Sequence, residues 1–130
     1  MKQKKIVIVD DFTGIRSIVR ETLVKKGFMV LEASSGEEAL KFFDGTQIDL
    51  LITDFDMPDM NGAELIAKIR DMIRYIYTPV IVLSGVRKER VESELAGLNI
   101  ACFIQKPFEI THFYSVVERL TGSLGREDKF

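Results

Sequence analysis

The chain has 130 residues, which is enough for one domain with a single sizeable core. Hydrophobic residues make up 46% and charged residues 29%, an ordinary balance for a globular protein, so disorder along the whole chain is not expected. The net charge of −2 excludes the strongly basic surface of a typical nucleic-acid-binding domain, and the single cysteine, Cys102, excludes an internal disulfide and a cysteine-built metal site.

The first apolar run spans residues 6–9 and follows a basic start, Met1–Lys5. It is too short for the core of a signal peptide, and no apolar run in the sequence approaches the length of a membrane span. One unpaired thiol also suits a reducing compartment. We therefore expect a cytoplasmic protein without membrane association.

Runs of β-branched and other apolar residues predict five strands, at residues 6–9, 29–31, 50–53, 80–83 and 101–104. Each run is continuous rather than alternating, as expected for strands that are covered on both faces. Such strands are typical of a parallel sheet with helices packed on either side.

Between the strands, apolar residues recur with helical spacing. Five sets predict one helix each: Ile15, Ile18, Val19 and Leu23; Ala39, Leu40 and Phe43; Leu65, Ile66, Ile69 and Ile73; Val91, Leu95 and Leu98; Phe113, Val116, Val117 and Leu120. Gly27 after a basic pair is typical of a helix end, and Ser35 before two glutamates is typical of a helix start. The pair Asn61-Gly62 predicts a break before the third helix.

Five strand-then-helix units in one domain predict an α/β fold with a doubly wound, five-stranded parallel sheet. Its crossovers are expected to be right-handed, and its binding site is expected beyond the carboxyl ends of the strands. We expect the domain to occupy residues 1–122 and a short polar tail to occupy residues 123–130. Without room for an effector domain, a signal would have to leave through the surface of the domain itself.

Charged and polar side chains stand at the ends of the predicted strands. Asp10 and Asp11 follow the first strand, Asp54 the third, Ser84 the fourth and Lys106 the fifth. If the first and third strands are neighbours, about 4.8 Å apart, three carboxylates come close together. Clustered carboxylates resist ionising together, and Mg²⁺ would relieve their repulsion. With an added ammonium and hydroxyl, the set suits a phosphoryl group, which a carboxylate can itself accept.

With these residues the chain resembles the receiver domain of bacterial two-component response regulators, over residues 4–121. The resemblance rests on four motifs: Asp10-Asp11, the stretch from Asp54 to Gly62, Ser84-Gly85, and Lys106-Pro107-Phe108. A narrower similarity to single-domain chemotaxis receivers rests on Asp10-Asp11-Phe12 with Arg16 and on Ile18-Val19-Arg20. The resemblance implies a flavodoxin-like (βα)5 fold with strand order 2-1-3-4-5.

The resemblance also implies roles for the residues at the acidic edge. Asp54 would accept a phosphoryl group from a sensor histidine kinase. Mg²⁺ would be bound by the side chains of Asp11 and Asp54, by Asp10 through a water molecule, and by the backbone carbonyl of Asp56. Lys106 would pair with the acceptor carboxylate and then with the phosphoryl group.

A conformational switch is implied as well. Ser84 would move toward the phosphoryl oxygen and Phe103 would turn inward, changing the face of the fourth helix, fifth strand and fifth helix. A downstream protein would bind that face, with no direct binding of nucleic acid. The protein would be a monomer or weak dimer whose only activities are self-phosphorylation and self-dephosphorylation. A cis peptide bond between Lys106 and Pro107 is also expected.

Two other functions stay open. Asp54-Phe55-Asp56 also resembles the Asp-x-Asp motif of haloacid-dehalogenase-type phosphatases, in which the first aspartate is the nucleophile and the second the acid/base. The third interpretation is a receiver fold that binds its partner constitutively. Many receivers have another residue in place of Asp56, whose carboxylate is expected to strengthen metal binding and to repel incoming phosphate. Its side chain could lie in the metal shell or in solvent, whereas Asp59 and His112 are expected to be structural or exposed.

Overall fold

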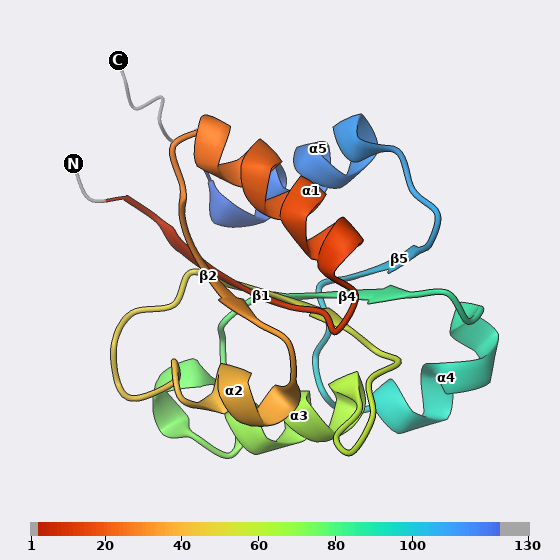
Figure 1. Ribbon diagram of the computed structural model, residues 1–130. Helices are drawn as coiled ribbons and strands as arrows, with labels where there is room; N and C mark the ends of the chain where they lie inside the picture. Colours follow the sequence, from red (N-terminus) through yellow and green to blue (C-terminus); the bar gives the residue numbers. More distant parts are fainter. Residues whose placement is uncertain (1–2, 123–130) are drawn as a thin grey trace.

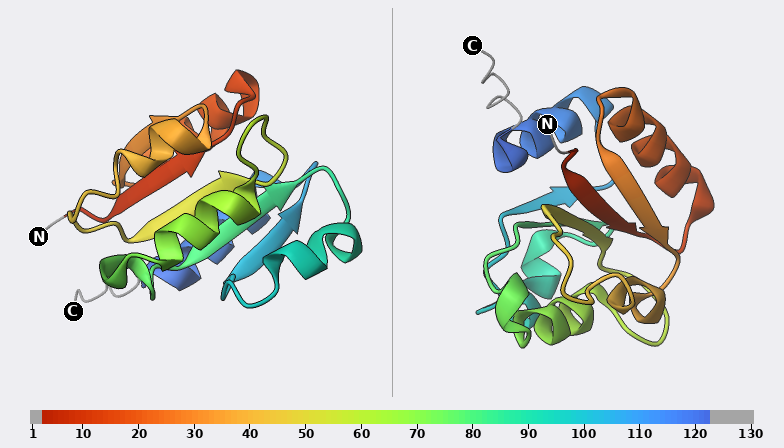
Figure 2. Two further views of the ribbon diagram at one scale, coloured as in Figure 1. Left: turned by 90° about the horizontal axis from the view of Figure 1, so that it is seen from below. Right: turned by 90° about the vertical axis from the view of Figure 1, so that its left-hand side faces the viewer.

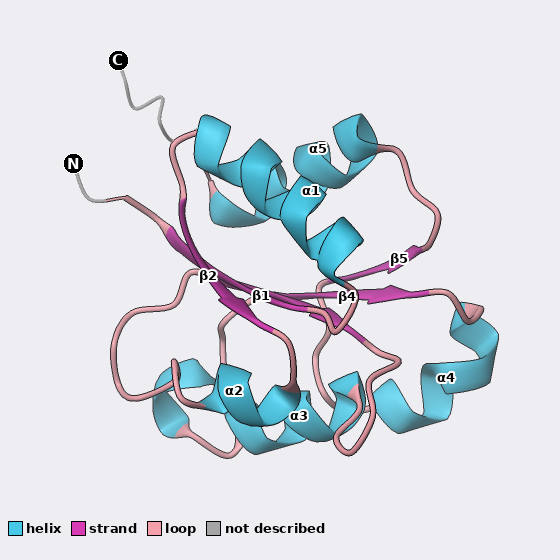
Figure 3. Ribbon diagram, viewed as in Figure 1, coloured by secondary structure: helices cyan, strands magenta, loops and turns pink. Residues whose placement is uncertain are grey.

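The structure of the protein is a computed structural model, which describes residues 3–122. Over this range, five strands alternate with five helices, and a short 3-10 helix precedes the fourth strand (Figures 1 and 3). In chain order the elements are β1 (Lys5–Val9), α1 (Thr13–Lys25), β2 (Met29–Ala33), α2 (Gly36–Leu40), β3 (Leu50–Asp54), α3 (Gly62–Arg70), η1 (Ile73–Tyr75), β4 (Val80–Ser84), α4 (Lys88–Leu95), β5 (Cys102–Gln105) and α5 (Ile110–Thr121). The tail expected at residues 123–130 lies outside the described residues.

The strands of the described chain form one parallel sheet in the order β2-β1-β3-β4-β5, which confirms the expected doubly wound fold. The register sets which residues meet at its carboxyl edge. Val9 of β1 lies opposite Thr53 of β3, so the next residues along, Asp10 and Asp54, leave the sheet side by side. The sheet thereby brings together two carboxylates that are far apart in the sequence.

Helices cover both faces of the sheet: α1 and α5 lie on one side, and α2, α3 and α4 lie on the other (Figure 2). Successive strand residues point to opposite faces, so Ile8 of β1 packs in the core beneath α1 and α5, whereas Val9 packs in the core on the other side. Both side chains are 1% exposed. Burial on both faces explains why the strand sequences are continuous apolar runs.

Side-chain caps fix the starts of α2 and α3, two of the three helices on the second face. The hydroxyl of Ser35 accepts a hydrogen bond from the Glu38 N–H at 3.1 Å and caps α2, as expected. Asn61 caps α3 through a reciprocal pair of hydrogen bonds with Glu64, a capping box. The predicted break at Asn61-Gly62 is therefore a helix start, with Gly62 as the first helical residue.

Four apolar residues depart from the predicted helical pattern, and one of them, Leu98, lies beyond the end of α4 and is partly buried against the core. Ile18 lies on the outer face of α1 and is 59% exposed, and Ile73 lies beyond the end of α3 and is 85% exposed. Phe43 is buried as expected, but α2 ends at Leu40 and the ring reaches the core from the following turn. There it packs edge-on against Tyr75, with ring centroids 4.9 Å apart. Helical spacing indicates burial but does not fix where a helix ends.

Cys102 is partly buried in β5 and packs against the core beneath α1 and α5. His112 is exposed on α5, as expected. Within residues 3–122, no helix has the length and apolar character needed to cross a membrane.

Candidate functional site: an acidic cluster at the carboxyl edge of the sheet

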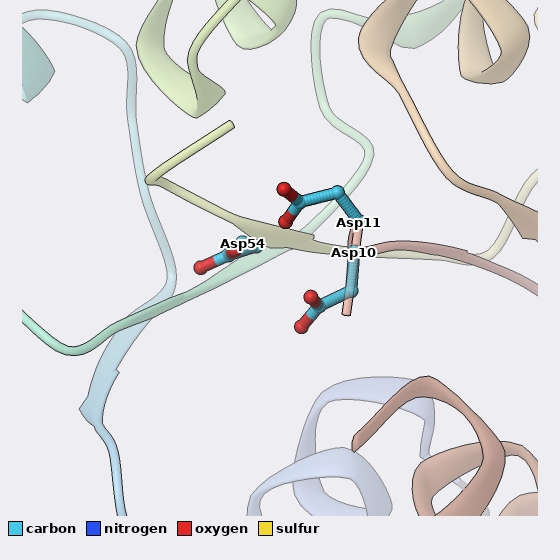
Figure 4. Close-up of side chains that lie close together, drawn as sticks. All are labelled: Asp10, Asp11 and Asp54. Atoms are coloured by element: carbon cyan, nitrogen blue, oxygen red, sulfur yellow. The ribbon is translucent and has the colours of Figure 1, made fainter. Parts of the chain in front are cut away.

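Three carboxylates meet beyond the ends of β1 and β3 (Figure 4). Asp10 and Asp11 come from the loop after β1, Asp54 is the last residue of β3, and one carboxylate oxygen from each lies within 4.8 Å of the others. Asp10 and Asp54 are only 1% and 3% exposed, whereas Asp11 faces solvent. We call Asp10, Asp11 and Asp54 the acidic cluster. It contains all three carboxylates that the sequence predicted to meet.

Burial makes the ionised form of Asp54 unfavourable. The pKa of Asp54 is raised from its ordinary value of 3.8 to about 6, first by burial and then by the neighbouring charge of Asp10, although Lys106 acts in the opposite direction. Asp10 is better accommodated, because one of its oxygens accepts a hydrogen bond from the Phe12 N–H at 2.9 Å and the other from Lys106 at 3.1 Å. The two buried carboxylates therefore differ. Both oxygens of Asp10 accept hydrogen bonds, whereas the ionised form of Asp54 is disfavoured by its surroundings.

Lys106 reaches the cluster from the end of β5. Its Nζ lies 3.1 Å from Asp10 Oδ2 and 3.2 Å from Asp54 Oδ1, so one ammonium pairs with both buried carboxylates. Burial alone would lower the pKa of Lys106, but the charges of Asp10 and Asp54 outweigh that effect and raise it. The peptide bond between Lys106 and Pro107 is cis, as expected.

One oxygen of the cluster lacks a full partner. Asp54 Oδ1 is buried and, despite its ion-pair distance from Lys106, has no hydrogen-bond partner among the described residues. A buried carboxylate oxygen in this situation is unfavourable unless another group meets it. Clustered carboxylate oxygens are the donor set that Mg²⁺ prefers, and one ion would both neutralise the cluster and satisfy this oxygen. The residues present therefore fit a divalent cation.

The hydroxyl of Ser84 takes part in two hydrogen bonds. Ser84 ends β4 and is fully buried, and its Oγ donates a hydrogen bond to Asp56 Oδ2 at 2.9 Å. The same oxygen accepts from the Val86 N–H at 2.9 Å. The Asp56 side chain is exposed and engages Ser84.

Two supporting residues were not assigned a role from the sequence. Arg16 donates a hydrogen bond to the Asp10 carbonyl at 2.6 Å and pairs with Glu32 at 3.1 Å, which holds the loop after β1. Gly62 packs so closely on β3 that a Cβ there would lie 2.8 Å from the Asp54 carbonyl oxygen. Arg16 stood in the chemotaxis-like motif, and Gly62 closed the motif around Asp54, but neither pattern revealed these contacts.

The other predicted residues lie around the cluster. Phe103 is in β5, opposite Val82 of β4, and is partly buried against the core on the α3 and α4 side. Asp59 is exposed, as expected, and adopts a left-handed backbone conformation with φ +68°. These positions do not by themselves assign a function to either residue.

Comparison with known proteins identifies the class. A model of the response regulator receiver domain matches residues 6–118, so the chain belongs to the response regulator receiver domain family. It is 38% identical over 108 residues to chemotaxis protein CheY1 of Helicobacter pylori (strain ATCC 700392 / 26695), covering 80% of this chain and 86% of the relative. It is 32% identical over 117 residues to chemotaxis protein CheY of Pseudomonas aeruginosa, covering 89% of this chain and 94% of the relative.

The fold is shared with solved chemotaxis receivers. The structure of chemotaxis response regulator CheY4 of Vibrio cholerae superposes with a TM-score of 0.84 at 28% identity, covering 92% of this chain and 99% of that one. The protein is therefore a CheY-like receiver domain, which confirms the resemblance drawn from its motifs. Receivers of this kind are signalling phosphoacceptors of two-component systems rather than true enzymes, and the family typically binds Mg²⁺ at an acidic pocket. Membership of this family favours signalling over the phosphatase alternative.

Proposed function

We propose that this protein is a phosphorylation-activated signalling receiver in which Asp54 accepts a phosphoryl group from a sensor histidine kinase. The observation that carries the proposal is the meeting of three carboxylates and the Lys106 ammonium at one edge of the sheet. Asp54 is the best-placed acceptor because it is the cluster carboxylate with a buried oxygen that lacks a hydrogen-bond partner among the described residues.

In the proposed reaction a carboxylate oxygen of Asp54 attacks the phosphorus of the donor. The bond from phosphorus to the leaving atom of the donor breaks, and its electron pair stays with the leaving group. Attack requires the ionised carboxylate, and a pKa of about 6 leaves Asp54 mostly ionised at neutral pH. Lys106, already 3.2 Å from Asp54 Oδ1, would follow the charge onto the phosphoryl oxygens.

Mg²⁺ would be held by the carboxylates of Asp11 and Asp54, by Asp10 through a water molecule, and by the backbone carbonyl of Asp56. Support comes from the oxygen-rich donor set and from the excess of negative charge that the single ammonium of Lys106 leaves in the acidic cluster. When bound, the ion would offset the negative charge that gathers between the acceptor and the incoming phosphoryl group.

Ser84 and Phe103 would transmit the change to the face of α4, β5 and α5, which we call the output face. Ser84 ends β4, and the next strand, β5, carries Phe103. Movement of the Ser84 hydroxyl toward the phosphoryl group would free space for the Phe103 ring to turn inward. A downstream protein would read the altered output face, and we propose that signalling takes place in the cytoplasm between monomers or weak dimers.

Acetyl phosphate with Mg²⁺ tests the proposal directly. Intact-protein mass spectrometry should detect one added phosphoryl group on the wild type and on Asp59→Ala, but none on Asp54→Ala. Asp59 is the matched control because it is an exposed aspartate in the loop that follows the acceptor. Equal incorporation in the two variants would show that Asp54 is not the acceptor. Repeated turnover of a phosphate monoester would instead support the phosphatase alternative.

A further inference from the structure

The Ser84 hydroxyl is fully engaged in this structure. Its proton goes to Asp56 Oδ2 and its oxygen accepts the Val86 N–H, each at 2.9 Å. A serine hydroxyl has one proton and can donate to one acceptor at a time. Ser84 therefore cannot donate to a phosphoryl oxygen at Asp54 without leaving Asp56.

Asp56 reaches Ser84 because β3 and β4 are neighbours in the sheet. Asp54 lies opposite Leu83, the residue before Ser84, and Asp56 stands two residues beyond Asp54 on the same edge. Asp56 is exposed while Ser84 is 0% exposed, so the contact joins a solvent-facing carboxylate to a buried hydroxyl. A hydrogen bond to a carboxylate is stronger than one to a neutral acceptor.

We propose that Asp56 is a positioning residue that holds Ser84 in its unphosphorylated arrangement and so opposes the switch. This inference rests on the proposed function and deepens it. Phosphorylation has to displace a charge-assisted hydrogen bond before Ser84 can turn, which makes the resting state more stable than it would be with a neutral residue at position 56. The charge of Asp56 also acts on Asp54 directly, because it is among the charges that raise the pKa of Asp54.

These two effects of Asp56 can be separated, because only one of them passes through Ser84. Simple charge repulsion between Asp56 and a phosphoryl group does not need the serine hydroxyl. Restraint through the hydrogen bond does need it. A double-mutant cycle between the two residues measures the coupled part alone.

Beryllofluoride, a tetrahedral mimic of a phosphoryl group, is the probe. Its dissociation constant is measured by NMR titration of ¹⁵N-labelled protein, with Mg²⁺ raised until the constant no longer depends on it. Asp56→Ala should bind beryllofluoride about tenfold more tightly than the wild type, which corresponds to the loss of one charged hydrogen bond. In a Ser84→Ala background the same substitution should tighten binding by clearly less, because only the direct charge effect of Asp56 is then removed. Asp56→Asn, which keeps an acceptor without the charge, should fall between, and Asp59→Ala should match the wild type.

The ligand-free proteins supply a second readout. The Val86 amide proton resonance should shift in Asp56→Ala, because the hydroxyl that it bonds becomes free to rotate, and should be unchanged in Asp59→Ala. An equal gain in affinity in both backgrounds would reduce Asp56 to a repelling charge and overturn the inference, as would weaker binding by Asp56→Ala. Failure of the wild type to bind beryllofluoride at all would overturn the proposed function, and the inference with it.

Discussion

Two groups of buried polar side chains lie at opposite ends of the sheet and are satisfied to different degrees. Before β3 and β4, at the amino end, the Tyr75 hydroxyl donates to the Thr46 carbonyl at 2.7 Å and accepts from the Gly45 N–H at 2.8 Å. At the carboxyl end, Asp54 is equally buried, but its Oδ1 has no hydrogen-bond partner among the described residues. The Lys106 ammonium that pairs with Asp54 also pairs with a second carboxylate, that of Asp10.

Arg70 extends the contrast at the amino end. Its guanidinium donates to three backbone carbonyls, those of Leu98, Tyr75 and Asn99, at 3.0, 2.7 and 3.0 Å. These bonds tie the end of α3 to the loops that enter β4 and β5. A half-buried cation that donates to three carbonyls is compatible with its position, whereas clustered buried carboxylates are not.

The difference indicates what each end of the sheet contributes. The polar groups of the amino end stabilise the fold, because each meets the partner that burial demands. The acidic cluster does the reverse: three carboxylates face one ammonium, and the pKa of Asp54 is raised to about 6. We infer that the acidic cluster lowers stability, as expected of a site whose groups are arranged for the binding of Mg²⁺ and a phosphoryl group proposed above.

The largest expected effect on the free energy of unfolding comes from a substitution at the amino end of the sheet. Tyr75→Ala should lower the free energy of unfolding by about 3–5 kcal/mol, because it removes a ring that is 2% exposed and both of its hydrogen bonds. Tyr75→Phe, which keeps the ring, should lose about 1–2 kcal/mol. Urea denaturation measures both, with Tyr77→Ala as the control, since Tyr77 is 84% exposed. If Tyr75→Ala loses no more stability than the control, the polar groups at the amino end of the sheet do not stabilise the fold as we infer.

A smaller effect is expected behind the acidic cluster. Gly62→Ala should lower the free energy of unfolding by about 1–3 kcal/mol, because the new Cβ would meet the backbone of Asp54 and Phe55, at 2.8 and 2.9 Å, which cannot move aside. Gly36→Ala is the matched control, because its Cβ would meet the flexible side chain of Met60, and that side chain can move aside. Equal losses in urea denaturation would mean that close packing on β3 does not restrain the acceptor strand.

The fold was predictable because its signals are local. The five strands are buried on both faces, so the sequence of each is a continuous apolar run. In the helices between them, apolar residues recur with helical spacing. Ile18 and Ile73 were counted in the apolar sets of the first and third predicted helices, but periodicity does not show which apolar residues a neighbouring element will cover. Both are exposed because no described element packs over them.

The candidate site was predictable in its members and not in its contacts. Asp10, Asp54 and Lys106 are brought together by strand register, which follows from the fold. The hydrogen bond from Ser84 to Asp56 depends on side-chain rotamers at the ends of two strands, and sequence spacing does not encode them. The close approach of Gly62 to the Asp54 carbonyl likewise depends on how α3 packs on β3.

The central claim, that the charge of Asp54 lowers stability, is tested most directly by the unfolding free energy of Asp54→Asn without divalent metal. The pKa of Asp54 rises from 3.8 to about 6 on folding, so the folded protein loses stability as the pH rises through this window. At pH 7.5 the variant should therefore be more stable than the wild type by about 1–3 kcal/mol. The gain should shrink below pH 6 and vanish below about pH 4, where the carboxyl is protonated in both states. A variant that is less stable than the wild type at pH 7.5 would contradict the account.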